Sequence, residues 1–248
     1  MKKLLLTLPA VCMFAPITTV AATEGVVQDN YSKVQLVTRT QYRTASDQFL
    51  QMFRIAGVVT EQDSMLRGMY WSIETNASMG NDFSEFKSSY NEAEFNKGFY
   101  FGKNAIKPGA VFSWNSSGLR VDPYVEFDRR WTKDFSTAIR ARYNINTYDS
   151  TDIYGETDRD RTQRYDLYIS YNLTDSVNIK YNPTYYVKTD NYHNRNGEND
   201  ILEHNVTVQY DATERFKPFI ELGDLGYNER FDDTEYQIRL GFRYQLAN

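Results

Sequence analysis

The sequence predicts an all-β protein, a transmembrane antiparallel β-barrel of about twelve strands with short periplasmic turns and longer outer loops. Segments of about ten residues alternate between apolar and polar side chains along the chain. After residue 22, no apolar stretch approaches the length of about 18 residues that a membrane helix needs. The chain has 20 Tyr, 15 Phe and only 6 Pro. Its mean hydropathy of -0.64 fits a wall that is apolar outside and wet inside.

The alternation is clear in residues 137–147. Successive side chains of a strand point to opposite faces, so Ile139 and Ile145 share one face and Arg140 and Arg142 lie on the other. An arginine that faced lipid at mid-depth would cost about 2–4 kcal/mol. We therefore expect Arg140 and Arg142 to point into a water-filled interior.

The other expected strands follow from the same pattern, which is weakest between residues 44 and 118. In chain order, the twelve segments are 31–43, 48–59, 67–75, 88–97, 105–114, 119–130, 137–147, 164–171, 177–188, 201–210, 216–222 and 236–246. Short turns alternate imperfectly with longer polar loops at 76–87, 148–160 and 189–199. An even strand number brings both ends to one side, as in outer-membrane barrels.

The first residues resemble a secretory signal peptide. Lys2 and Lys3 precede an apolar run that is broken by Pro9 and Pro16, and small residues end at Ala22. We expect residues 1–22 to be this signal and residues 23–248 to form the barrel. The single cysteine, Cys12, lies inside the apolar run, which argues against a lipoprotein and leaves the exported chain without a disulfide.

The overall charge limits the choice of partner. The chain carries a formal charge of -5, and loss of Lys2 and Lys3 makes it two units more negative. A net acidic protein is a poor candidate for nucleic acid binding, so any cationic function is local.

A soluble β-sandwich is the main alternative fold. Two features oppose it, namely the mid-strand arginines and the tyrosines that gather near strand ends, as membrane interfaces require. The tyrosines concerned are Tyr165, Tyr171, Tyr181, Tyr185, Tyr236 and Tyr244.

Short motifs between Leu119 and Leu246 resemble the oligogalacturonate-specific porins of the KdgM type, to which a sialic-acid channel is related. They are residues 119–124, 140–143, 164–166, 203–206, 217–221 and 236–239. The resemblance implies a monomeric twelve-stranded barrel in the Gram-negative outer membrane, whose facing tracks of arginines pass acidic sugars. It also implies contacts with membrane lipid, lipopolysaccharide and the barrel assembly machinery. Residues 23–117 resemble the family only in barrel pattern, and the chain ends in Ala247-Asn248 rather than in the usual aromatic residue.

Arginine suits such a channel because it stays charged and pairs bidentately with carboxylates. Conduction needs several weak sites rather than one deep one. The candidate substrate-binding residues are Arg39, Arg43, Arg54, Arg120, Arg130, Arg140, Arg142, Arg164, Arg239 and Arg243, with Lys180 and Lys188 assisting. Tyr124, Tyr168 and Tyr186 are candidates for stacking on sugar rings. Alternatively, some arginines pair with carboxylates and brace the lumen; the candidates are Asp122, Glu126, Asp128, Asp166, Glu203 and Glu221.

The expected function is passive diffusion of acidic oligosaccharides across the outer membrane, without enzymatic activity, cofactor or metal. A general small-solute porin and a barrel hydrolase that uses His204 remain alternatives. The acidic loop 148–160 lacks the ligand spacing of a calcium site, so we expect a solvated loop.

Overall fold

The computed structural model describes residues 34–59, 64–80, 85–189 and 192–247, so the predicted signal peptide lies outside the described residues. The regular structure in this part of the chain is entirely β-strand. The strands are β1 (Val34–Arg43), β2 (Gln48–Val58), β3 (Met69–Ser78), β4 (Lys87–Lys97), β5 (Phe99–Phe101), β6 (Asn104–Asn115), β7 (Gly118–Arg130), β8 (Phe135–Asn146), β9 (Ser150–Thr151), β10 (Thr157–Asp158), β11 (Arg161–Asn172), β12 (Val177–Lys188), β13 (Asp200–Tyr210), β14 (Phe216–Asn228) and β15 (Asp233–Ala247).

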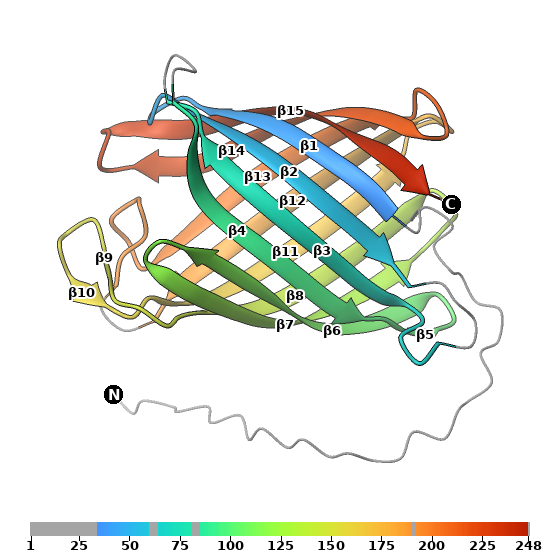
Figure 1. Cartoon of the computed structure of the whole chain (residues 1–248), viewed down its shortest axis with the longest axis horizontal. Helices are drawn as coiled ribbons and strands as arrows, with labels where there is room; N and C mark the ends of the chain where they lie inside the picture. Colours follow the sequence, from blue (N-terminus) through green and yellow to red (C-terminus); the bar gives the residue numbers. More distant parts are fainter. Residues whose placement is uncertain (1–33, 60–63, 81–84, 190–191, 248) are drawn as a thin grey trace.

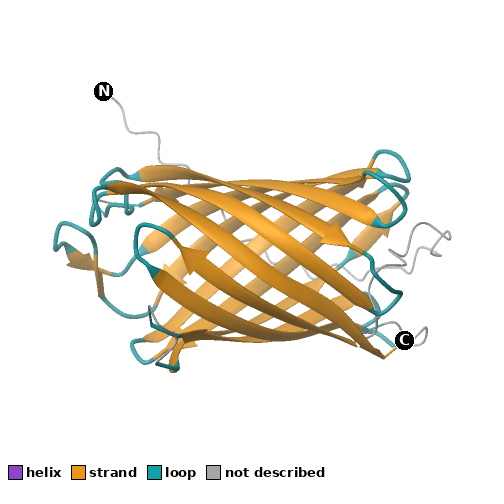
Figure 2. Cartoon of the chain, turned by 90° about the horizontal axis from the view of Figure 1, so that it is seen from above, coloured by secondary structure: helices purple, strands orange, loops and turns teal. Residues whose placement is uncertain are grey.

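Twelve of these strands form a closed antiparallel barrel, which confirms the predicted fold (Figure 1). Neighbours in sequence pair in order, β1 pairs with β15, and β4 pairs with β6 to complete the ring. The strands run steeply tilted around the wall, as closure of a sheet into a barrel requires (Figure 2). Closure leaves no exposed sheet edge between these strands.

Three short strands lie outside the ring of twelve. β5 extends the pairing of β6 at one end of the barrel, and β9 and β10 form a small hairpin in the loop between β8 and β11 (Figure 1). Neither was predicted, because segments of two or three residues carry no detectable alternation. Among the described residues, no helix is long and apolar enough to span a membrane.

The two faces of the wall are opposite in polarity. Large apolar side chains are exposed on the outside, for example Ile139 (57%) and Leu240 (58%). Buried side chains are largely polar, and Asp122, Asp166 and Gln237 are almost fully enclosed. A soluble sandwich would bury the first group and expose the second, so that alternative is wrong.

Strand boundaries differ from the predictions where the alternation is interrupted. The loop predicted at 76–87 is shorter, because β3 continues to Ser78 and β4 starts at Lys87. β14 continues to Asn228 rather than residue 222, and its register with β15 shifts between Asp224 and Tyr227. Gly226 lies in this irregularity with a φ of +79°, which favours glycine. The bulge interrupts the two-residue alternation of polar and apolar side chains. The sequence pattern therefore did not show residues 223–228 as part of the strand.

Connections alternate between the two ends of the barrel. The β1–β2, β3–β4, β6–β7, β8–β11, β12–β13 and β14–β15 connections share the end opposite to the start of β1. By the usual topology of outer-membrane barrels, this is the outer end. It carries the two long connections around residues 147–160 and 189–199. The rule of short periplasmic turns is imperfect, because the β2–β3 connection is also long.

Candidate functional site

A cavity of about 1870 Å³ occupies the interior of the barrel. Its lining includes fifteen arginines and lysines but only five aspartates and glutamates. Eleven of the twelve predicted cationic residues belong to this lining: Arg39, Arg43, Arg54, Arg120, Arg130, Arg140, Arg142, Arg164, Lys180, Arg239 and Arg243. The twelfth, Lys188, lines a smaller pocket near the outer end. The cavity is thus locally cationic although the whole chain is acidic.

The fold puts these cations on two opposing walls. Arg39 and Arg43 lie on β1, and Arg140 and Arg142 lie on β8, which is six strands away in the ring of twelve. The neighbouring strands extend both groups. β15 and β2 carry Arg239, Arg243 and Arg54, and β7 and β11 carry Arg120, Arg130 and Arg164.

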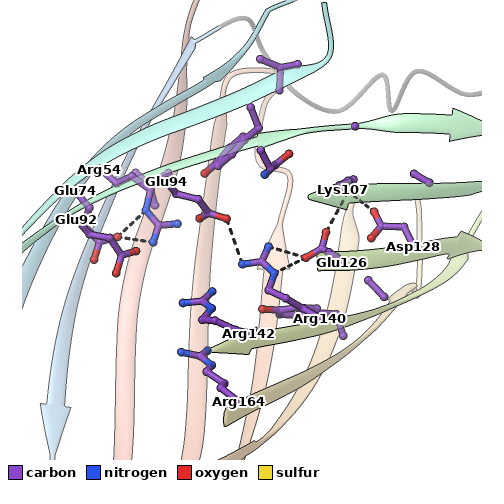
Figure 3. Close-up of a pocket in the computed structure, with 18 of the residues that line it drawn as sticks. Arg54, Glu74, Glu92, Glu94, Lys107, Glu126, Asp128, Arg140, Arg142 and Arg164 are labelled. Carbon is purple, nitrogen blue, oxygen red and sulfur yellow. Dashed lines mark hydrogen bonds and ion pairs between the residues drawn. The ribbon is translucent and has the colours of Figure 1, made fainter. Parts of the chain in front are cut away.

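Arg140 on β8 is held by carboxylates from two other strands (Figure 3). Its Nη2 lies 2.6 Å from Oε2 of Glu126, and its Nη1 lies 3.2 Å from Oε1 of Glu94. Its guanidinium carbon is 4.2 Å from the ring centre of Tyr124. The side chain is only 13% exposed. These contacts fix the arginine against the wall and compensate its charge.

Other predicted cations are also paired, as the bracing interpretation requires. Arg120 lies 3.0 Å from Asp122, and Arg164 lies 2.7 Å from Asp166. The further pairs are Arg54 with Glu74, Arg142 with Asp122, Lys188 with Asp160 and Arg239 with Glu221. Three of these six pairs belong to the wall formed by β7, β8 and β11.

A second group has no carboxylate partner among the described residues: Arg39, Arg43, Arg130, Lys180 and Arg243. The Nε atoms of Arg39 and Arg43 are buried without a hydrogen-bond partner. The guanidinium carbon of Arg243 lies 5.8 Å from the ring centre of Phe219. Because none of these cations forms a direct ion pair within the described residues, their potential acts on solutes in the cavity.

Three lumen carboxylates on β3 and β4 were not predicted from the sequence, namely Glu74, Glu92 and Glu94. Glu92 accepts a hydrogen bond from Ser113 at 3.2 Å, and it lies beside the Arg54–Glu74 pair (Figure 3). The alternation of Glu92 and Glu94 with Ala93 and Phe95 carried the signal, but the uncertain strand boundaries in this region concealed it.

The predicted tyrosines differ in position. Tyr168 and Tyr186 line the cavity. Tyr124 is only 4% exposed, and its hydroxyl donates to Oε1 of Glu94 at 2.5 Å. It therefore supports the Arg140–Glu94 contact from behind rather than facing the cavity.

Neither histidine lies in the main cavity lining. Nδ1 of His204 lies 2.8 Å from the hydroxyl of Tyr181, which is on the outward face of β12. His193 lies in the β12–β13 loop and contacts Asp152 of the β8–β11 loop at 2.7 Å. The described residues contain no cluster of three or more potential metal ligands.

Asp152 ties the two long outer loops together. Its oxygens accept hydrogen bonds from the backbone N–H groups of Tyr154, Glu156 and His193 as well as from the His193 ring. Burial opposes ionisation, but these hydrogen bonds outweigh it and lower the pKa of Asp152 below its ordinary value. An acid of the loop 148–160 thus has a structural role.

Comparisons with known proteins agree with this geometry. Residues 27–246 match the family model described as "Oligogalacturonate-specific porin protein (KdgM)". The chain is 30% identical over 145 residues to the N-acetylneuraminic acid outer membrane channel protein NanC of Escherichia coli (strain K12), covering 57% of this chain and 61% of the relative. It is 26% identical over 143 residues to the oligogalacturonate-specific porin KdgM of Dickeya dadantii (strain 3937), covering 57% and 60%. These alignments span about three-fifths of the relatives' lengths.

The crystal structure of the NanC porin in a rhombohedral form superposes with a TM-score of 0.74 at 26% identity, covering 85% of this chain and all of that one. The match extends through the first half of the chain, where the sequence showed only a barrel pattern. With its closed barrel, the chain is an outer-membrane protein. It belongs to the family of oligogalacturonate-specific porins.

Proposed function

We propose that this protein is a channel for passive diffusion of acidic oligosaccharides across the outer membrane. The observation that supports this most strongly is that Arg39, Arg43, Arg130, Lys180 and Arg243 line the cavity without an ion pair among the described residues. A water-filled passage with excess fixed positive charge concentrates anions and repels cations.

The two groups of cations suggest different roles in binding the sugar. On the wall of β1 and β15, unpaired arginines offer donors to a passing carboxylate. On the wall of β7, β8 and β11, paired arginines together with Tyr168 and Tyr186 offer a more nearly neutral surface for hydroxyls and ring faces. A charged sugar chain would slide with its carboxylates toward the first wall and its rings toward the second.

Arginine donors spaced along the barrel favour movement over retention. Each guanidinium binds a carboxylate weakly in water, because hydration and screening oppose the attraction. A polymer that carries one carboxylate per sugar can exchange one contact for the next without leaving a deep minimum. The names of two relatives refer to an oligogalacturonate and to N-acetylneuraminic acid, both acidic sugars. We propose the same chemical class here.

The closed barrel encloses its own cavity, so we propose that a single chain suffices for transport. Lipid and lipopolysaccharide would contact the apolar outer face, and the assembly machinery would insert the barrel. We propose no enzymatic activity, since the relatives named above are channels and His204 lies on the outer face.

Swelling of proteoliposomes tests the proposal. We expect faster entry of a galacturonate oligomer than of a neutral oligosaccharide of equal length. Equal rates for the two sugars would instead favour a general small-solute porin. Entry of neither sugar would contradict a transport role for the cavity.

A further inference from the structure

A second, smaller pocket lies beside the main cavity at the outer end of the barrel. Its volume is about 310 Å³, at the lower end of the range for small-molecule sites. Arg120 and Tyr186 belong to the lining of both cavities, so the two lie side by side. A solute that enters from outside passes this pocket before it reaches the unpaired arginines of β1 and β15.

The strand register builds the inner wall of the pocket. Asn144 on β8 pairs with Thr162 on β11, and Thr162 pairs with Lys188 on β12. These three side chains therefore stand in one row across the sheet. Tyr186 and Ile201 lie in the next row and provide a less polar floor.

Residues 192–199 of the β12–β13 loop form the opposite side, and hydrogen bonds hold them in place. Asp152 binds the ring of His193, the Asn194 side chain donates to the carbonyl of Asn199, and Nε of Arg195 donates to the carbonyl of Leu225 at 3.0 Å. His193, Asn194 and Arg195 all line the pocket. These hydrogen bonds order the loop residues before a ligand binds, which lowers the entropic cost of binding.

The chemistry of the lining indicates the ligand. Oδ1 of Asn144 is buried without a hydrogen-bond partner, so it is an acceptor available to a hydroxyl. Lys188 lies 2.5 Å from Asp160, and its ammonium has three donors, so this one carboxylate does not use all of them. Each of the three cations in the lining has an ion-pair partner, because Arg120 pairs with Asp122 and Arg195 pairs with Glu203. The pocket therefore offers the remaining donors of Lys188 beside an unused hydroxyl acceptor.

We propose that this pocket is an entry subsite for the terminal residue of an acidic sugar, with the carboxylate at Lys188 and a ring hydroxyl at Asn144. This inference rests on the proposed function and adds a sided binding step to it. Because the subsite lies only at the outer end, a single uronate should reach it more readily from that side. The sugar would then pass from this subsite to the cations of the main cavity.

Block of single-channel current by galacturonate monomer, added separately to each side, tests the subsite. For the unaltered channel we expect block at lower concentration from the outer side. Lys188→Gln should weaken that block about tenfold, as loss of one charged hydrogen bond predicts, and should leave block from the other side unchanged. Asn144→Ala should weaken it less, with no change in charge.

Lys180→Gln is the matched control, because it removes the same charge from the same strand at a lumen position outside the pocket. It should alter ion selectivity without abolishing the difference between the sides. Equal block from both sides in the unaltered channel, or unchanged outer block in both Lys188→Gln and Asn144→Ala, would overturn the subsite. Either result can occur while the channel stays anion-selective, so it would leave the proposed function standing. An unaltered channel that shows no anion selectivity would refute the proposed function instead.

Discussion

Arg140 and Arg39 provide a direct test of the division between paired and unpaired arginines. Each lies on a barrel strand and lines the same cavity, and each can be changed to glutamine with loss of one charge. In Arg140→Gln, the carboxylates of Glu126 and Glu94 both lose a guanidinium partner. In Arg39→Gln, no ion pair within the described residues is broken.

The expected cost follows from the enclosure of these groups. Arg140 is 13% exposed, and the Glu126 and Glu94 side chains are 9% and 11% exposed. Breaking a buried ion pair by removing one partner costs about 3–5 kcal/mol. Water in the cavity screens the two carboxylates, and Glu126 keeps Lys107 as a partner at 3.3 Å, so we expect about 3 kcal/mol for Arg140→Gln. For Arg39→Gln we expect less than about 1 kcal/mol.

Urea unfolding of the barrel in lipid vesicles measures both values, with the free energy taken from linear extrapolation. Each substitution removes one guanidinium charge from the cavity wall, so general effects of charge removal cancel in the comparison. Equal losses of stability for Arg39→Gln and Arg140→Gln would refute the division of the lumen into bracing and free arginines.

Two further predictions concern the wall and the outer loops. Ile139 faces outward and Ala138 lines the cavity, so Ile139→Arg should lower the free energy of unfolding by about 2–4 kcal/mol while Ala138→Arg changes it little; similar losses would contradict the assigned faces. The lowered pKa of Asp152 means that its carboxylate stabilises the loops above its ordinary pKa of about 3.9, and that this contribution is lost as pH falls through the lowered value. Hydrogen exchange at the amides of Tyr154 and Glu156 should therefore show protection at pH 7 that declines in strong acid, whereas Asp152→Ala, which removes both acceptor oxygens, should remove most of the protection at both pH values. Protection that is unaffected by Asp152→Ala would exclude this carboxylate as the tether.

The barrel could be predicted from the sequence because the side chains of each strand alternate between the lipid-facing side and the lumen-facing side. The alternation of Ile139 with Arg140 and Arg142 depends only on residues that are adjacent in the chain, and the structure confirms it. Lumen placement of the predicted cations followed from the same local rule. The end of β14 was missed because the bulge before Tyr227 breaks that rule.

The pairing of arginines with carboxylates on other strands could not be predicted, because it depends on which strands meet and in which register. Arg140 and Glu94 are 46 residues apart, and Arg239 binds Gln41 from 198 residues away. No periodicity in the sequence encodes such contacts. The sequence therefore identified a cationic group, and only the closed sheet separates its paired members from Arg39, Arg43 and Arg243.

Ion selectivity tests the central proposal most directly. With a gradient of potassium chloride across a planar bilayer, the reversal potential of the unaltered channel reports the ratio of chloride to potassium permeability. The excess of unpaired cations in the cavity predicts a preference for chloride, which should fall when Arg39, Arg43 and Arg243 are changed together to glutamine. A reversal potential on the potassium side for the unaltered channel would contradict the proposal.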